Sequence, residues 1–233
     1  MNRLKTNNIS ALLLLVGFGL LLTAVLDPIP FGATPMPAGD IILREAAHEI
    51  GTANLVTAVV LAYRGFDTLG ELTILFVAAT AAVWFWGRGG KGRAFRPGGF
   101  VLRAGADLLF PFLLVVGAYI ITHGHLTPGG GFQGGAVLAA AFFVPLLADP
   151  ASRFKSRAAA WIEGGAGVLF ILIGLAAWAN GKAFLTPLLG PGVVGEVFSA
   201  GTVPLLYGAV GVKVGAELAG LLAALLAEPG DRS

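Results

Sequence analysis

Two ionisable residues stand four positions apart inside a long apolar segment. Lys213 and Glu217 lie in 201–227, which exceeds the roughly 20 residues needed to cross a bilayer. Side chains at this spacing leave the same face of a helix, so the two groups can form an ion pair. A charge near the bilayer centre costs at least about 2.5 kcal/mol, and such residues usually face protein or water and mark ion or proton paths. Two interpretations stay open: Lys213 serves an ion or proton path, or the pair is structural and carries nothing.

A second group of candidates lies in the segment YRGFDTLGE at 63–71, which joins two apolar segments. Thr68 and Glu71 have the spacing of a capping box, and Asp67 would stabilise the same helix start electrostatically. The alternative makes Glu71, with Asp67 nearby, a proton carrier inside the membrane. Spacing alone favours the cap.

Two more carboxylates lie near the starts of predicted membrane-spanning helices. Asp107 follows Arg103 by four positions, which predicts a structural ion pair that also offers a route for protons. Glu163 lies about one turn inside its apolar segment. It is either a helix-start carboxylate, which the helix dipole stabilises, or part of a half-channel open to the cytoplasm.

The loop HGHLTPGGGFQGG at 123–135 brings together His123, His125 and a run of glycines. Consecutive glycines can adopt positive φ, so the loop can fold tightly against its neighbours or dip into the membrane. Its backbone groups would then line an ion path, as they do in broken helices; the alternative is a tight hairpin between two spans. The small residues Gly134 and Gly135 predict close packing of the helix that follows.

The residues also argue against several classes of function. Cys is absent, which excludes disulfides and Cys-ligated clusters, and the 3 histidines are too dispersed for a resident metal site, although His123 and His125 could chelate weakly. The sequence lacks a Ser/His/Asp set, an HExxH motif, a P-loop and a dinucleotide fingerprint, so we expect no cofactor and no catalysis by this chain alone. The net charge of +2 comes from basic residues that flank apolar segments, which indicates membrane topology rather than nucleic-acid binding.

The elements that position these residues must be membrane-spanning helices. The chain is 56% hydrophobic and 12% charged, whereas charged residues make up about 25% of soluble domains. We predict an all-α, polytopic integral membrane protein with about seven spans in the lipid bilayer. The second span is the weakest, because Thr52, Asn54 and Thr57 are tolerable there only if they face protein. The predicted spans are 9–26, 48–63, 68–87, 101–122, 132–148, 158–179 and 201–227.

A basic, glycine-rich segment at 88–100 separates two predicted modules, 1–87 with about three spans and 101–233 with about four. The loops richest in Lys and Arg, 87–103 and 152–157, fall on the same side, which the positive-inside rule makes cytoplasmic. We therefore expect a multi-pass protein of the cell membrane with its N-terminus outside and its C-terminus in the cytoplasm. The basic residues near the N-terminus, Arg3 and Lys5, disagree with this orientation.

Three segments together resemble subunits of Mrp-type multisubunit Na⁺/H⁺ antiporters. Residues 45–83, with FDTLGE, look like the C-terminal part of the large Mrp subunit and like the E subunit of membrane-bound hydrogenases. Residues 101–147, with GHLTPGGGFQGG, look like the MnhB (Mrp B) subunit. The tail GTVPLLYGAVGVKVGAELAG at 201–220 is closer to the F subunit of the hydrogenase group. The resemblance covers nearly the whole chain.

The resemblance implies a fused membrane subunit of a cation/proton antiporter module, alone or coupled to a [NiFe] hydrogenase or related redox arm. Its partners would be the other antiporter subunits. The one metal ion to bind would be a transient Na⁺. The resemblance raises Glu71 to an ion-path carboxylate as well as a cap, and it matches Lys213 to the family's intramembrane Lys. Glu217 stands where that pattern usually has a small residue, and it would neutralise Lys213. The alternative role is a non-conducting scaffold that links antiporter subunits to the redox arm.

Overall fold

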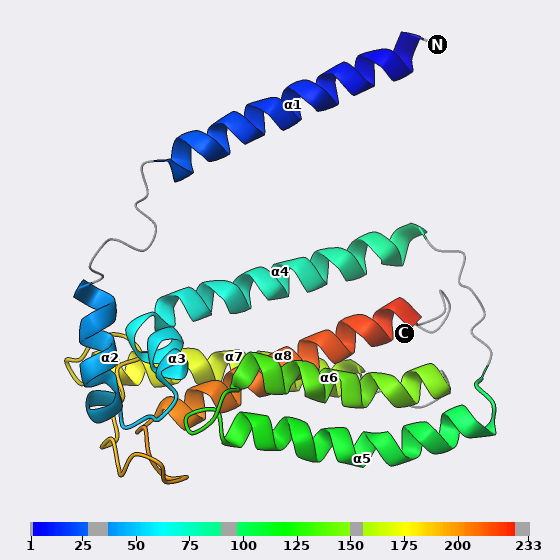
Figure 1. The fold of residues 1–233 in the computed structure, drawn as a ribbon. Coiled ribbons are helices and arrows are strands. Elements are labelled where there is room, and N and C mark those ends of the chain that lie inside the picture. The colour runs from blue at the N-terminus through cyan, green and yellow to red at the C-terminus, as the bar shows by residue number, and fades with distance from the viewer. Residues whose placement is uncertain (1, 28–36, 90–96, 150–155, 227–233) are drawn as a thin grey trace. The chain divides into compact units, whose positions relative to one another are not determined.

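The computed structural model describes residues 2–27, 37–89, 97–149 and 156–226, and all regular secondary structure in these ranges is helical. The chain forms two compact units, 1–40 and 41–233, and the first of them contains α1. The helices are α1 (Asn2–Leu26), α2 (Pro37–Ile50), α3 (Leu55–Thr57), the π-helix η1 (Ala58–Tyr63), α4 (Gly65–Gly89), α5 (Phe100–Thr122), α6 (Gly131–Ala148), α7 (Ser156–Ala179) and α8 (Val203–Leu226) (Figure 1).

Five helices of the described part, α4 to α8, are long and apolar enough to cross a membrane. They confirm the predicted all-α, polytopic class, whereas the predicted total of seven spans is not confirmed. The apolar stretch of α1, Ala11–Leu26, is helical as predicted but shorter than these five. The prediction of a continuous helix at 48–63 is wrong, because the chain leaves helical geometry after Ile50 and resumes it at Leu55.

The break between α2 and α3 is built from small and polar residues. Gly51 has a φ of +78°, and a Cβ atom there would collide with the backbone of Pro191, so only glycine suits this position. Asn54 caps α3, because its side-chain oxygen accepts hydrogen bonds from the N–H groups of Val56 and Thr57 at 3.1 and 3.4 Å. The polar residues that made this segment a weak span therefore end one helix and start another.

The same residues attach the break to the loop before α6. Thr52 donates a hydrogen bond to the carbonyl of His125 at 2.7 Å. Asn54 and Thr57 both donate to the carbonyl of Gly124, at 2.8 and 2.7 Å. These bonds confirm that the polar side chains face protein, and they connect parts of the chain that are about 70 positions apart.

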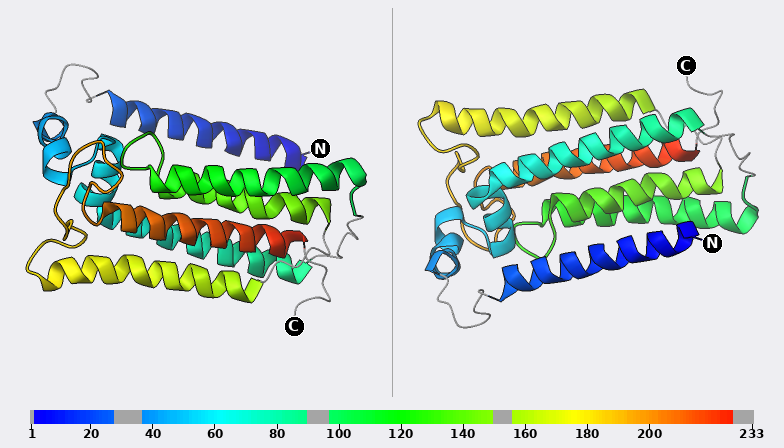
Figure 2. Two further views of the ribbon diagram at one scale, coloured as in Figure 1. Left: turned by 90° about the horizontal axis from the view of Figure 1, so that it is seen from below. Right: turned by 90° about the horizontal axis from the view of Figure 1, so that it is seen from above.

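Helix α8 is the centre of the second unit. It contacts α4, α5, α6 and α7, and it lies between α6 and α7 (Figure 2). Helices α4, α6 and α8 run in one direction and α5 and α7 in the other, so the loops 123–130 and 180–202 lie at the same end of the bundle (Figure 1). The buried residues of α8 include Lys213 and Glu217, so packing places this pair inside the protein.

Glycines bring α6 and α8 into close contact. A Cβ atom at Gly131 would lie 2.5 Å from the carbonyl oxygen of Tyr207, and one at Gly135 would lie 2.8 Å from that of Gly211. Gly134 packs as tightly against α5. Because the nearest atoms in α8 belong to the backbone, a side-chain rotation could not relieve the collision. This contact confirms the predicted close packing of the helix after the glycine-rich loop.

Candidate functional site

Lys213 lies between two carboxylates that come from two helices. Its ammonium donates to Glu217 of α8 at 2.8 Å and to Glu163 of α7 at 3.4 Å. The ring of Phe76 in α4 has its centre 5.3 Å from the same nitrogen, within the range of a cation–π interaction. Three helices therefore meet at one charge, of which spacing in the sequence predicted only the contact with Glu217.

This Lys213 cluster (Lys213, Glu163 and Glu217) lies within the membrane-spanning helices, with Lys213 and Glu217 buried and Glu163 half-buried. The exposed fractions of the three side chains are 11% for Lys213, 19% for Glu163 and 2% for Glu217. Two carboxylates and one ammonium sum to a charge of −1 if all are ionised, and a low-dielectric surrounding penalises that net charge. The Oε1 atom of Glu217 is buried and has no hydrogen-bond partner in the described part of the chain. One further positive charge, such as a proton, would balance the cluster.

A groove of about 280 Å³ opens beside the Lys213 cluster. Its lining includes Thr73 and Phe76 of α4, Glu163 of α7, and Lys213. Glu217 is not part of this lining. Lys213 therefore connects a carboxylate at the groove with a carboxylate that is buried and does not line it.

Glu71 lines a different groove, of about 120 Å³, near the end of the bundle where the loops gather. The walls of this Glu71 groove are residues 56–61 of α3 and η1, the glycine-rich residues 129–133, and Tyr207 and Val210 of α8. Non-helical backbone at a helix break is typical of ion sites in transporters, because its N–H and C=O groups are free to face the ion. The groove thus combines a carboxylate with a glycine-rich backbone, as the loop sequence suggested.

The capping-box interpretation of Thr68 and Glu71 is wrong. Helix α4 begins at Gly65, four residues too early for Thr68 to be its N-cap. Thr68 donates instead to the carbonyl of Val60 at 2.6 Å, where the π-helix leaves the regular α-helical pattern. Glu71 is exposed to its groove and has no capping role.

The remaining two carboxylates lie apart from both grooves. Asp67 is in the first turn of α4, as predicted for a helix-start acid, and it forms an exposed ion pair with Arg64. The predicted pair of Arg103 with Asp107 is wrong, since Arg103 donates to the carbonyl of Gly98 at 3.1 Å. Arg103 turns back toward the start of α5, as a snorkelling arginine does, and so away from the exposed Asp107.

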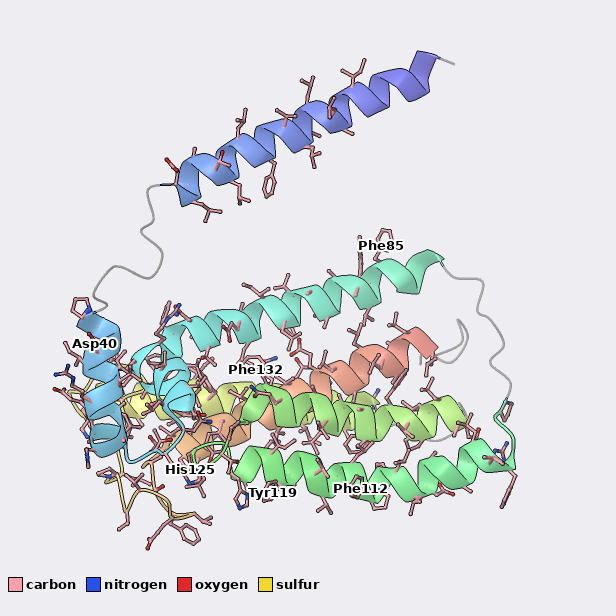
Figure 3. The ribbon with its side chains drawn as sticks, in the orientation of Figure 1. Asp40, Phe85, Phe112, Tyr119, His125 and Phe132 are labelled. Carbon is pink, nitrogen blue, oxygen red and sulfur yellow. The ribbon has the colours of Figure 1, made fainter. Side chains whose placement is uncertain are left out.

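The two histidines have separate partners. His123 stacks on Tyr119, with ring centres 4.1 Å apart. His125 lies at the loop end of the bundle (Figure 3) and is fully buried. Its Nδ1 lies 2.5 Å from the hydroxyl of Tyr207, and its Nε2 lies 3.2 Å from the backbone carbonyl of Glu196. Because a carbonyl only accepts, Nε2 carries a proton and Nδ1 of the neutral ring accepts from Tyr207. Burial lowers the pKa of His125, which favours this neutral form.

Sequence reasoning missed the roles of two residues. Tyr207 has its partner His125 82 positions away, so no local spacing connects them. The hydroxyl of Tyr207 could have indicated that a partner exists, because a buried Tyr usually forms a hydrogen bond. Glu163 was a candidate but had no assigned partner. The sequence did contain a clue, because Glu163 is a carboxylate inside the membrane and such a group usually pairs with an opposite charge such as Lys213.

Comparison with known protein families tests the predicted resemblance to the MnhB subunit. Residues 101–220 match the domain related to the MnhB subunit of Na⁺/H⁺ antiporters, and these 120 residues are just over half of the 233 in the chain. This chain belongs to the MnhB-related family. Residues 8–98 of the MnhB-related chain match a second family, that of the MBH protein MbhE.

Similar proteins extend this result to nearly the whole MnhB-related chain. A chain of the membrane-bound sulfane sulfur reductase, an archaeal respiratory membrane complex, is 39% identical with a TM-score of 0.80, covering 94% of this chain and 98% of that one. An uncharacterized protein of Methanocaldococcus jannaschii is 31% identical over 201 residues, which cover 72% of this chain and 74% of the relative. A chain of the Mrp complex from Dietzia shares the fold, with a TM-score of 0.75 and 24% identity.

The alignment with the Dietzia chain covers 98% of the MnhB-related chain but only 26% of that longer protein. Together with the family matches, these likenesses confirm the predicted resemblance to Mrp-type antiporter subunits. The five spanning helices and the membrane complexes among the relatives establish a multi-pass membrane protein.

Proposed function

We propose that this chain is a membrane subunit of a multisubunit cation/proton antiporter module. The module works either as a stand-alone Mrp-type antiporter or joined to the redox arm of a respiratory complex, such as a hydrogenase or a sulfane sulfur reductase. The observation that carries this proposal is the Lys213 cluster, in which a buried ammonium lies between one buried and one half-buried carboxylate inside the membrane-spanning helices. A structural ion pair would be complete with one carboxylate. The second carboxylate gives the cluster a charge that depends on one proton.

The proposed exchange follows from electrostatics. A cation such as Na⁺ close to the cluster favours release of its proton, and loss of the proton in turn favours binding of the cation. In a low-dielectric interior this coupling is far stronger than in water. Glu71 would form a second charge site on the route, in the groove lined by glycine-rich backbone.

The proposed orientation keeps the C-terminus in the cytoplasm, as the basic loops predicted. The predicted outside position of the N-terminus depended on a full crossing at 48–63. Residues 55–63 form only short helical segments, too short to cross. If α1 crosses the membrane, the N-terminus also lies in the cytoplasm, and the basic residues Arg3 and Lys5 then agree with the positive-inside rule.

The second candidate is a non-conducting scaffold that links antiporter subunits to a redox arm. The observation that favours it is the tight contact of α6 with α8 through Gly131 and Gly135, which suits a rigid support. The two candidates differ in one respect: a scaffold does not need the carboxylates of the two grooves to ionise.

The test is antiport by the intact complex, purified from native membranes in mild detergent with its partner subunits identified by mass spectrometry. Glu71→Gln and Glu163→Gln keep side-chain size and remove the charge. We expect each variant to assemble normally and to lose cation-dependent proton movement in everted vesicles. Glu45→Gln, at an exposed position of α2, is the matched control and should keep wild-type antiport. Undiminished antiport in both groove variants would support the scaffold instead.

A further inference from the structure

Tyr207 lies between two cavities at the loop end of the bundle. One is the Glu71 groove. The other, here the loop cavity, has a volume of about 450 Å³ and is lined by residues that include Thr122, Phe198 and Ser199. Among the described residues that line these two cavities, Tyr207 is the one common to both. This shared position makes Tyr207 the candidate to pass protons from one cavity to the other.

The hydroxyl of Tyr207 has two acceptors within reach. It lies 2.5 Å from Nδ1 of His125 and 3.3 Å from the carbonyl oxygen of Thr122. A phenol has a single proton to donate. When His125 is neutral, the phenol donates to Nδ1. When Nδ1 of His125 is protonated, it donates to the phenol oxygen, and the phenol proton turns to Thr122. Both protonation states are hydrogen-bonded without movement of any heavier atom.

The surroundings of His125 suit a proton acceptor that holds its proton only briefly. The titratable side chains facing it are Tyr207 of α8 and His123 of the same loop, while Glu196 offers its backbone carbonyl. The ion pairs of the described residues place no carboxylate on this ring, so an imidazolium there would not be trapped. The backbone is also held in place, since Thr52 and Asn54 both donate to the His125 carbonyl, at 2.7 and 3.0 Å.

We propose that Tyr207 and His125 form a proton relay between the loop cavity and the Glu71 groove. A proton from the loop cavity binds the phenol oxygen as the O–H bond directed at His125 breaks and an N–H bond forms at Nδ1. In the second step Nδ1 returns its proton to the phenol oxygen, and the other phenol proton leaves into the groove, where the Glu71 carboxylate accepts it. The relay rests on the proposed function, because it supplies the protons that antiport exchanges.

The test separates proton transfer from the rest of the transport cycle. The complex is reconstituted in proteoliposomes with Na⁺ or K⁺, whichever drives proton movement in the wild type. One assay follows cation-driven proton movement. The other follows isotope exchange of the same cation at equal pH on both sides, which needs no net proton transfer.

Two variants remove the relay and keep the packing. Tyr207→Phe lacks only the hydroxyl, and His125→Gln retains hydrogen-bonding groups but cannot take up a proton. We expect each to slow proton movement by at least about tenfold, given that positioned proton donors contribute factors of roughly 10²–10⁴, and to leave cation isotope exchange unchanged. Tyr119→Phe, at an exposed tyrosine of α5, is the matched control and should behave as wild type.

Other outcomes overturn the relay. Equal loss of proton movement and isotope exchange would show that the pair is only structural, and full retention of both would show that protons travel elsewhere. If Glu71→Gln abolishes antiport while Tyr207→Phe does not, the relay fails and the proposed function stands. A wild-type complex that moves no protons would overturn both.

Discussion

The Lys213 ammonium lies 3.4 Å from the carboxylate of Glu163, a residue 50 positions earlier in the chain. Because Glu217 lies 2.8 Å from the same nitrogen, the half-buried Glu163 and the buried Glu217 share one base. An ion pair of one acid and one base is neutral, whereas this cluster has a net charge of −1 if all three groups are ionised, and a low-dielectric surrounding penalises that charge. The proposed coupling between protons and cations rests on this shared charge.

Removing one partner of the Lys213–Glu217 pair should be costly. We expect Lys213→Ala to lose about 3–5 kcal/mol of stability, since it leaves the buried Glu217 carboxylate without its partner. Glu217→Ala should lose less, because Lys213 keeps its contact with Glu163. The double variant should recover much of this loss but not antiport, measured as thermal unfolding midpoint and as proton movement in vesicles. Arg64→Ala, which breaks an exposed ion pair with Asp67, should cost at most about 1 kcal/mol. Recovery of antiport in the double variant would mark the pair as structural.

The helix break should depend on Asn54. Its side chain caps α3 and donates to two carbonyls of the loop before α6. We expect Asn54→Ala to lower stability by about 2–4 kcal/mol, the sum of a lost cap and lost hydrogen bonds. Asn180→Ala, at an exposed residue that donates to one carbonyl, should cost less than about 1 kcal/mol. Similar unfolding midpoints for the two variants would contradict this account of the break.

A methyl group at Gly135 should destabilise the contact of α6 with α8. Because the new Cβ would lie 2.8 Å from the carbonyl of Gly211, Gly135→Ala has to push two backbones apart. We expect a loss of about 1–3 kcal/mol, typical of overpacking. Gly220→Ala, where a Cβ meets nothing within 4 Å, should be neutral or stabilising. Thermal unfolding in detergent compares the two, and a stable Gly135→Ala protein would disprove the tight contact.

The burial of His125 makes stability depend on pH. The pKa of His125 is lowered in the folded protein, whereas an unfolded histidine titrates near pH 6.5. As the pH falls through about 6.5, the unfolded chain takes up this proton first, so the folded state loses stability; well above that pH the effect vanishes. Unfolding midpoints at pH 8 and pH 5.5 should differ more in the wild type than in His125→Gln. Identical pH dependence in the two proteins would refute this assignment.

The proposed orientation can be tested directly because the chain has no Cys. The variant Lys182→Cys, at an exposed position in the loop between α7 and α8, should react with a membrane-impermeant maleimide in intact cells. Cysteines that replace Arg157 and Arg3 should react only after the membrane is opened. Labelling of an Arg3→Cys variant in intact cells would instead support the original prediction of an N-terminus outside the cell.

Much of the fold could be predicted from the sequence, for a physical reason. A bilayer demands long apolar helices, so hydropathy alone located the five spans from α4 to α8. The polar residues Thr52 and Asn54 also marked 48–63 as a weak span. What hydropathy could not show was that this segment breaks at Gly51, because the break depends on the loop that receives its hydrogen bonds.

The contacts within the candidate sites also divide into those that the sequence predicted and those that only the tertiary structure showed. Lys213 and Glu217 are four positions apart, so helical geometry by itself brought them together. The contacts of Glu163 with Lys213 and of His125 with Tyr207 join residues 50 and 82 positions apart. Contacts between helices depend on their packing, here on the glycines that bring α6 against α8 and on the central place of α8. Sequence spacing reports only neighbours within about one helical turn, and so the tertiary structure alone decided which charges and hydroxyls meet.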